Sequence, residues 1–499
     1  MTPDPTPHHE DQTNRSTIAG IAIWDFLGRL ANFFVLFVIS VFLTRLLTPA
    51  EFGSFAVVLA VISLSGIFID LGFRSAIIQQ RNISQTQLST VFFINLLIGL
   101  GLASLLFFGS GFIERFYGID NLSSYLGAAS SLFVLNALAL VPGGLLQKQL
   151  RLKELSVINT IAAALSGIAA LAMAIRGYGI WSLVAPQIIL GSATCIGVFW
   201  RTKWLPSMAF TVRSIVPLWN YGIRLFLAGL ADTIFTRLDV FIIGKIFPLQ
   251  ILGFYNRAQT LDSLVKTFSS TTTTSVAFPV IANMAEDREA VRAFYLRCLN
   301  VISFLAFLLI GVLFLTCFDI VIILFTETWL EVGFYFRIMA LTAFVYPISA
   351  LMVNLIAALG NSAAFLKLEL LKKAVLFPAY ISFLFGGVML FLVVLGILYL
   401  VALLLNAEFV RREIDVSLKI QFGAIYKYAG LGLIAGAAAY AASYFIDNIY
   451  LHLIAASTIF SLLYLGLCYF LKLSGTLEIT GRLISIYNAK RNTNLSSAS

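Results

Sequence analysis

Charged side chains interrupt two long apolar runs that together cover residues 221–279. These charged residues are Arg224, Asp232, Arg237, Asp239, Asp262 and Lys266. An ionisable group at bilayer depth costs about 2.5–3.5 kcal/mol on insertion scales, so such groups usually face a bundle interior or a wet cavity. We therefore expect these residues to line a transport path for a polar, anionic cargo.

Helical geometry places most charges of the first run on one face. At 100° per residue, Asp232 and Asp239 fall within about 80° of Arg224 around the helix. Arg237 lies about 220° from Arg224 and points away from that face. Arg224 has no carboxylate three or four residues away. A guanidinium without a local partner is well suited to grip a phosphate through two parallel hydrogen bonds.

Two acid–base pairs have the four-residue spacing that brings side chains together on a helix. They are Asp262 with Lys266 in the second run, and Asp25 with Arg29 near the start of the chain. Each pair has two readings: a buried ion pair that fixes helix register, or part of a cavity where three polar helices converge. On the cavity reading, the expected substrate-binding cations are Arg29, Arg224, Lys266 and Arg237.

The carboxylates within apolar runs could also couple transport to an ion. A carboxyl group in a low-dielectric cavity binds a proton more readily, and a nearby cation opposes this. Such a group can hold a proton or a sodium ion in one conformation and release it in another. The candidates, led by Asp232, are Asp232, Asp239, Asp25, Asp262 and Asp70.

The elements that must position these residues are transmembrane helices. Of the 499 residues, 60% are hydrophobic and 11% are charged, whereas a soluble domain is about a quarter charged. A helix needs about 20 apolar residues to cross a bilayer, and the apolar runs form about fourteen such spans. The net charge of +9 comes from residues at span ends, so we expect no nucleic-acid partner.

The expected spans lie at 21–43, 54–73, 89–113, 123–145, 156–175, 180–200, 218–243, 252–280, 300–324, 333–358, 366–386, 388–408, 428–446 and 452–472. The split between the eleventh and twelfth spans falls at Gly386-Gly387. Residues 285–298 are amphipathic, and we expect a connecting helix along the membrane interface.

An internal repeat divides the chain. The segment 45–55 corresponds to the segment 245–255 at a constant offset, which pairs Gly53 with Gly253. Two six-helix lobes in parallel orientation are expected around a central cavity. The predicted organisation is a cytoplasmic tail (1–17), an N-lobe (18–205), a C-lobe (216–410), an added helix pair (428–473) and a cytoplasmic tail (474–499).

Lysine and arginine placement predicts cytoplasmic ends for the chain, because most of these residues then lie on the cytoplasmic side. The outside turns would hold Arg45, Arg115, Arg176, Lys245, Arg257 and Arg337.

Sequence motifs for catalysis are missing. The chain has no GxxxxGK[ST], HExxH, CxxC or GxSxG pattern, and the short outside loops offer no room for an active site. We therefore predict no catalytic residues, no metal site, no cofactor and no enzymatic activity.

Three stretches together resemble the polysaccharide transporter family, the Wzx-type flippases of the multidrug/oligosaccharidyl-lipid/polysaccharide exporter superfamily. They are LGFRSAIIQQRNISQTQLSTVFFINLLIGL (71–100), LVPGGLLQKQLRLKELSVINTIAAALSGIAALAMAIRGYGIWSLVAPQII (140–189) and LGFYNRAQTLDSLVKTFSSTTTTSVAFPVIANM (252–284). The resemblance implies a bacterial inner-membrane protein that moves undecaprenyl-pyrophosphate-linked oligosaccharides between leaflets. Its expected partners are this cargo, the surrounding membrane lipids and polysaccharide polymerase machinery. The resemblance also implies that Arg29 and Lys266 are cavity cations.

Two other functions stay open at this point. A multidrug cation antiporter of the same superfamily should have an acidic cavity, whereas cations here are as numerous as carboxylates. A polymerase or ligase of surface glycans would need catalytic residues in a sizeable outside loop.

Overall fold

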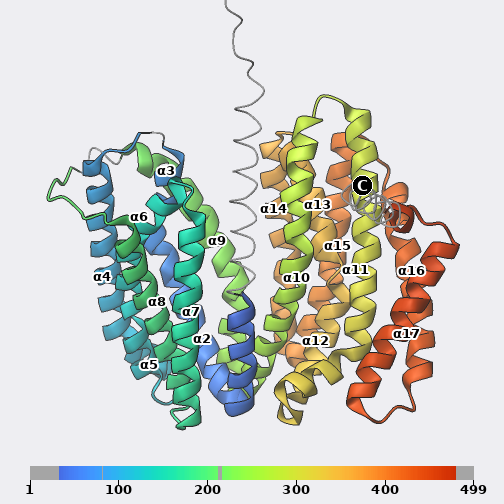
Figure 1. Cartoon of the computed structure of the whole chain (residues 1–499), viewed down its shortest axis with the longest axis horizontal. Helices are drawn as coiled ribbons and strands as arrows, with labels where there is room; N and C mark the ends of the chain where they lie inside the picture. Colours follow the sequence, from blue (N-terminus) through green and yellow to red (C-terminus); the bar gives the residue numbers. More distant parts are fainter. Residues whose placement is uncertain (1–32, 81, 212–215, 479–499) are drawn as a thin grey trace, which may run out of the picture. The chain divides into compact units, whose positions relative to one another are not determined.

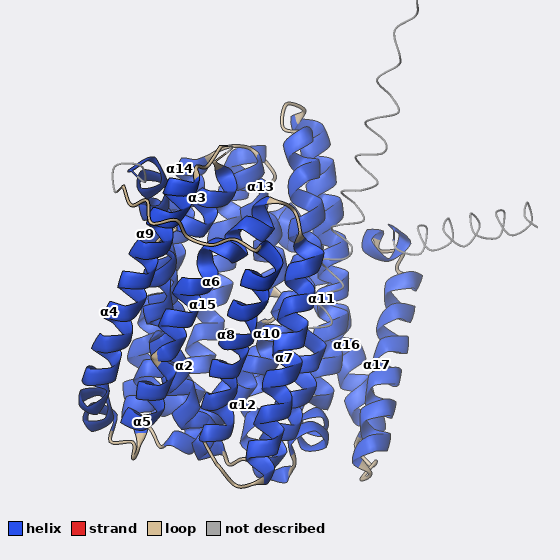
Figure 2. Cartoon of the chain, turned by 60° about the vertical axis from the view of Figure 1, so that its left-hand side comes forward, coloured by secondary structure: helices blue, strands red, loops and turns tan. Residues whose placement is uncertain are grey.

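The computed structural model describes residues 33–80, 82–211 and 216–478, and every regular element within these ranges is a helix (Figures 1 and 2). Ten of the described helices are long and apolar enough to cross a membrane. The all-helical membrane fold predicted from composition is thereby confirmed, and the count of about fourteen spans stays a prediction.

The chain forms two compact units, Met1–Asn256 and Arg257–Ser499. The helix that begins at Leu249 continues across this boundary without interruption. The lobe boundaries inferred from the repeat stay a prediction.

The first unit contains the helix Phe33–Leu46, then α2 (Pro49–Asp70), α3 (Phe73–Gln79), α4 (Gln85–Tyr117), α5 (Leu122–Ala129), α6 (Ser131–Lys148), α7 (Leu152–Ile175), α8 (Trp181–Thr202), α9 (Val216–Ile246) and the start of α10 (Leu249–Asn283). The second unit contains the rest of α10, α11 (Arg288–Phe325), η2 (Glu327–Trp329), α12 (Leu330–Thr342), α13 (Val345–Ala358), α14 (Ser362–Leu376), η3 (Phe377–Ser382), α15 (Phe383–Ile414), α16 (Leu418–Ser443) and α17 (Ile449–Phe470).

The start of α2 shows how the sequence places a helix end. The Thr48 hydroxyl accepts a hydrogen bond from the Glu51 backbone N–H, and the Glu51 carboxylate accepts one from the Thr48 N–H at 2.7 Å. This reciprocal capping box satisfies two backbone donors, and Pro49 at the first helical position has no donor to satisfy. The four-residue sequence TPAE therefore fixes where α2 begins.

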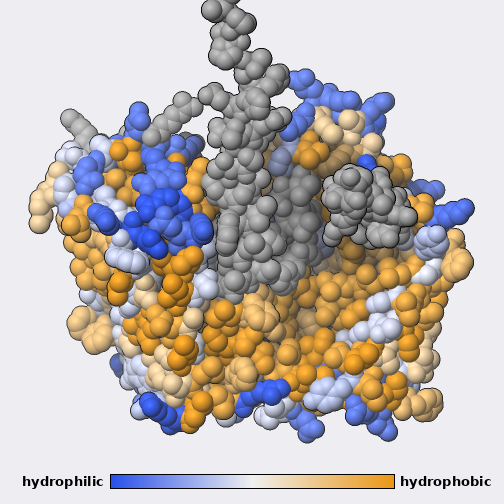
Figure 3. Space-filling model, viewed as in Figure 1, coloured by the Kyte–Doolittle hydropathy of each residue, from blue (hydrophilic) through white to orange (hydrophobic). Residues whose placement is uncertain are grey.

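In the first unit, α7 packs along α8, α6 contacts both α4 and α8, and α2 packs against α9. The visible helices of this unit are hydrophobic along their middle, and hydrophilic residues gather near their ends (Figure 3). This pattern is the one expected of helices that cross a bilayer.

Two hydrophobic cores of described residues hold the second unit together. The larger joins α10, α11, α13, α14, α15 and α16 through residues such as Ile281, Leu351 and Leu403. The smaller joins α11 to α16 and α17 through the stacked rings of Phe304, Tyr464 and Phe460. The larger core is the one that positions the candidate site.

Three local expectations have clear outcomes. The break expected at Gly386-Gly387 is confirmed, because Gly387 has φ 67° and ψ −159°, a conformation essentially restricted to glycine. The separate interfacial helix expected at 285–298 is wrong, since Asp287 caps α11 and the helix runs on to Phe325. The placement of Arg257 in an outside turn is also wrong, because this residue lies within α10 and is 7% exposed.

Candidate functional site

The charged centre of the second unit is an ion pair within α10. The Lys266 Nζ lies 2.5 Å from the Asp262 Oδ2. Asp262 is 7% exposed and Lys266 is 30% exposed at the side chain. Lys266 stands at the middle of a 35-residue helix, which is about 50 Å long and therefore longer than the roughly 30 Å hydrocarbon core. The pair predicted from the four-residue spacing is present.

Two tyrosines from other helices face the Lys266 ammonium. Its Nζ lies 5.9 Å from the ring centroid of Tyr346 on α13 and 5.8 Å from that of Tyr399 on α15. A cation within about 6 Å of an aromatic ring is attracted by the ring quadrupole. Lys266 is thus held between one carboxylate and two aromatic rings.

The larger hydrophobic core fixes the helices that carry these side chains. Tyr399 packs against this core, and Leu403 on the next turn of α15 is buried in it. Tyr346 follows the buried Val345 at the start of α13 and is itself exposed. The core therefore supports the Tyr399 ring and the helix that carries Tyr346, while the Lys266 side chain remains partly exposed.

A second buried carboxylate occurs in the first unit. The Tyr255 hydroxyl donates a hydrogen bond to the Asp239 Oδ2, and the Val240 N–H donates to the Asp239 Oδ1 at 2.7 Å. Asp239 is 6% exposed and Tyr255 is 2% exposed. This contact ties the end of α9 to the beginning of α10.

The remaining predicted site residues differ in their surroundings. The Asp70 carboxylate accepts a hydrogen bond of 3.0 Å from the Arg74 N–H, so it satisfies a backbone donor in the first turn of α3. On α9, Asp232 is exposed and Arg237 is half-buried. Asp25 and Arg29, together with the side chain of Arg224, lie outside the described residues. Cargo and ion binding by these residues, and the convergence of three polar helices, stay predictions.

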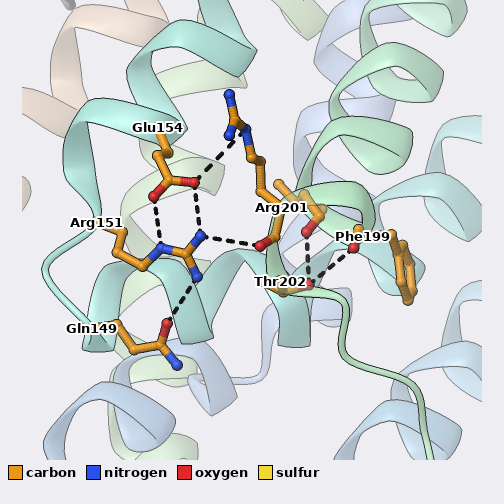
Figure 4. A network of polar contacts seen from close by, with 7 residues as sticks. Gln149, Arg151, Glu154, Phe199, Arg201 and Thr202 are labelled. Carbon is orange, nitrogen blue, oxygen red and sulfur yellow. Dashed lines mark hydrogen bonds and ion pairs between the residues drawn. The ribbon is translucent and has the colours of Figure 1, made fainter.

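A polar network joins the start of α7 to the end of α8 (Figure 4). Arg151 grips the Glu154 carboxylate through Nε at 2.7 Å and Nη2 at 2.8 Å, and Arg201 Nε lies 3.7 Å from the same carboxylate. The hydrogen bonds that Arg151 donates to the Glu154 carboxylate raise the pKa of Arg151. These side chains are about one-third or more exposed, so the network lies at the protein surface.

Sequence reasoning did not identify Tyr346 and Tyr399. Each is a polar-tipped aromatic residue within an apolar run, which is a weak signal because aromatic residues are common in such runs. Their contact with Lys266 depends on the packing of α10, α13 and α15. Among the described residues, no group of three or more histidine, cysteine or acidic side chains could hold a metal ion.

The long apolar helices make this chain a multi-pass membrane protein, and its fold is that of transporters of the MOP superfamily. The lipid II flippase MurJ, in its inward closed conformation, aligns with a TM-score of 0.70 at 16% identity over 92% of this chain and 100% of MurJ. An inward-facing multidrug resistance MATE transporter of the MOP superfamily aligns with a TM-score of 0.60 at 13% identity, over 78% of this chain and 94% of the MATE transporter.

Residues 42–333 match the model of the family described as polysaccharide biosynthesis protein, and the chain belongs to this family. The sequence resemblance to polysaccharide transporters is thereby confirmed.

The chain is also similar to curated proteins. It is 25% identical to the succinoglycan biosynthesis transport protein ExoT of Rhizobium meliloti over 55% of this chain and 56% of ExoT. It is 23% identical to the lipopolysaccharide biosynthesis protein WzxC of Escherichia coli over 68% of this chain and 69% of WzxC. It is 28% identical to the teichuronic acid biosynthesis protein TuaB of Bacillus subtilis. The matches to ExoT and TuaB span a little over half the length of those proteins.

Proposed function

We propose that this protein moves undecaprenyl-pyrophosphate-linked oligosaccharides from the cytoplasmic to the periplasmic leaflet of a bacterial inner membrane by alternating access. It acts as a transporter and not as an enzyme, and both ends of the chain face the cytoplasm. The family, and the curated relatives named for transport or biosynthesis of succinoglycan and lipopolysaccharide, support this cargo class.

The observation that carries the proposal is the position of Lys266. An ammonium group at the middle of a helix longer than the bilayer is thick is expensive unless a partner or a wet cavity compensates for it. Its side chain is partly exposed, which is compatible with contact to a phosphate oxygen. A charge-assisted hydrogen bond of this kind contributes about 1.5–3 kcal/mol. Lys266 therefore provides a cationic contact for the pyrophosphate, with Arg29, Arg224 and Arg237 as further predicted contacts.

The test is transport in cells that lack the chromosomal copy and carry a plasmid copy. With Lys266→Gln, lipid-linked oligosaccharides should accumulate facing the cytoplasm, where they are inaccessible to a lectin added to spheroplasts. Lys266→Arg should retain partial transport because the charge is kept. The matched control is Lys419→Gln, which removes an exposed lysine in the first turn of α16 and should transport normally.

Two results would contradict the proposal. Normal glycan export together with increased drug sensitivity in the deletion strain would indicate a multidrug antiporter. Accumulation of unpolymerised units that face the periplasm would indicate a polymerase or ligase.

A further inference from the structure

The ion pair on α10 creates a competition for one cation. The Lys266 Nζ is only 2.5 Å from the Asp262 Oδ2, so the carboxylate takes one of the three N–H donors of the ammonium and would be a close anionic neighbour of a bound phosphate. A phosphate that engages Lys266 closely must draw the ammonium away from Asp262 or share it. This argument rests on the proposed function, which makes Lys266 a contact for the pyrophosphate.

Sharing the ammonium is electrostatically unfavourable. Asp262 is nearly fully buried, and a buried carboxylate that loses its cation and gains an anionic neighbour is strongly destabilised in the charged form. Binding of a proton to the Asp262 carboxylate would remove this destabilisation. The two tyrosine rings remain beside the ammonium during this exchange and continue to stabilise its charge.

Few other ionisable groups occur near the pair on the described parts of α10, α11, α13 and α15. In α13, Tyr346 is the one ionisable residue, and in α15 the first ionisable residue is Tyr399, followed two or more turns later by Glu408, Arg411, Arg412 and Glu413. Glu408 pairs with both Arg411 and Arg412. On α11 no charged residue occurs between Arg297 and Asp319. On α10 itself, Arg257 lies more than one turn before Asp262. Among the described residues, Asp262 is the carboxylate that pairs with Lys266, so we expect it to respond when the charge near Lys266 changes.

We propose that the cargo pyrophosphate displaces Asp262 from Lys266 and that Asp262 then binds one proton from water for each cargo molecule bound. The Lys266 N–H that donated to Asp262 donates to a phosphate oxygen instead, and an O–H bond forms at the Asp262 carboxylate. Release of the cargo re-forms the ion pair and frees the proton. The same residue pair thus binds the cargo and couples it to protons.

The experiment is calorimetric binding of geranyl pyrophosphate, a soluble isoprenyl pyrophosphate, to the purified full-length protein near pH 7. Measuring the binding enthalpy in buffers with different ionisation enthalpies gives the number of protons taken up per probe bound. Wild-type protein should take up about one proton more than Asp262→Asn, because the asparagine cannot bind the displaced proton. Asp262→Asn should also bind the probe about tenfold more tightly, since the Asp262 carboxylate no longer competes for the Lys266 ammonium. Lys266→Gln should lose at least tenfold in affinity.

The matched control is Asp120→Asn, which removes an exposed carboxylate from a turn of the first unit and should keep the wild-type proton count. If Asp262→Asn does not fold, the wild-type protein made with ¹³C-labelled aspartate serves instead. Its infrared difference spectrum on probe binding should then show a new carboxylic-acid C=O band that shifts with the label.

The outcomes separate this inference from the proposed function. Binding that depends on Lys266, with equal proton uptake by wild-type and Asp262→Asn, would overturn the coupling and leave the function standing. If probe binding requires sodium when Asp262 is present and not in Asp262→Asn, the coupling ion would be sodium. This result would also overturn the proton coupling. No binding of the probe to the wild-type protein would contradict both.

Discussion

Gly53 on α2 and Gly253 on α10 occupy reciprocal positions at the crossing of their two helices. A Cβ atom on Gly53 would stand 2.0 Å from the carbonyl oxygen of Leu249, and one on Gly253 would stand 1.9 Å from that of Pro49. Real Cβ contacts are never this short, so only glycine allows the two backbones to approach so closely.

This reciprocity bears on the internal repeat. The contact pairs Gly53 with Leu249 and Gly253 with Pro49, and each residue differs from its repeat counterpart by the same offset. A two-fold relation between the segments 45–55 and 245–255 would produce such an exchange. All four residues belong to the first unit, and the two-lobe layout of the whole chain stays a prediction.

Replacing either glycine of this crossing should destabilise the protein. Gly53→Ala or Gly253→Ala should cost about 1–3 kcal/mol, because the added methyl group meets backbone that cannot move aside. Thermal unfolding in detergent measures this loss. The control is Gly101→Ala on α4, where nothing lies within 4 Å of the added atom. Equal melting temperatures for Gly253→Ala and Gly101→Ala would show that the helices can separate freely.

The glycine at the break in α15 should be needed for its backbone conformation. Gly387→Ala places a side chain at φ 67° and ψ −159°, which should cost about 1–3 kcal/mol. Chemical denaturation would measure the change, with Gly423→Ala on α16 as the control in open space. If Gly387→Ala had the same denaturation midpoint as the wild-type protein, the two helical segments would have to meet in some other backbone conformation.

The hydrogen bond between Tyr255 and Asp239 should stabilise the hairpin of α9 and α10. Tyr255→Phe leaves the buried carboxylate without this donor, so a loss of about 1.5–3 kcal/mol is expected. A double-mutant cycle with Asp239→Asn isolates the pairwise contribution. If the two single losses simply add, the residues do not interact energetically.

The network at the start of α7 should contribute much less. Arg151 and Glu154 are about one-third exposed, so solvent and salt screen their attraction. Glu154→Gln should change the unfolding free energy by less than about 1 kcal/mol, and high salt should reduce even this difference. A larger loss that persists in high salt would show that membrane or headgroup contacts shield the pair.

The two tyrosines at Lys266 can be tested separately from its charge. Tyr399→Phe keeps the ring and should bind geranyl pyrophosphate almost as tightly as wild type. Tyr399→Leu removes the cation–π attraction and should weaken binding by about two- to fivefold. Equal affinities for the phenylalanine and leucine variants would show that the ring does not hold the ammonium for the cargo.

The sequence by itself determined the features that depend on neighbouring residues. Composition and the length of the apolar runs predicted an all-helical membrane protein, because a bilayer demands about 20 apolar residues per helix. The Gly386-Gly387 pair marked a helix break. The four-residue spacing of Asp262 and Lys266 predicted an ion pair, since such residues meet on one face of a helix.

Only the tertiary structure decided which helices meet. It placed Tyr346 and Tyr399 beside Lys266, and it buried Arg257 where the sequence suggested a turn. Hydrophobic periodicity identifies a packed face when the other face is polar, but in a membrane protein the lipid-facing side is apolar as well. Side-chain partners far apart in the chain are therefore set by close packing and polar contacts between helices, which the apolar pattern does not encode.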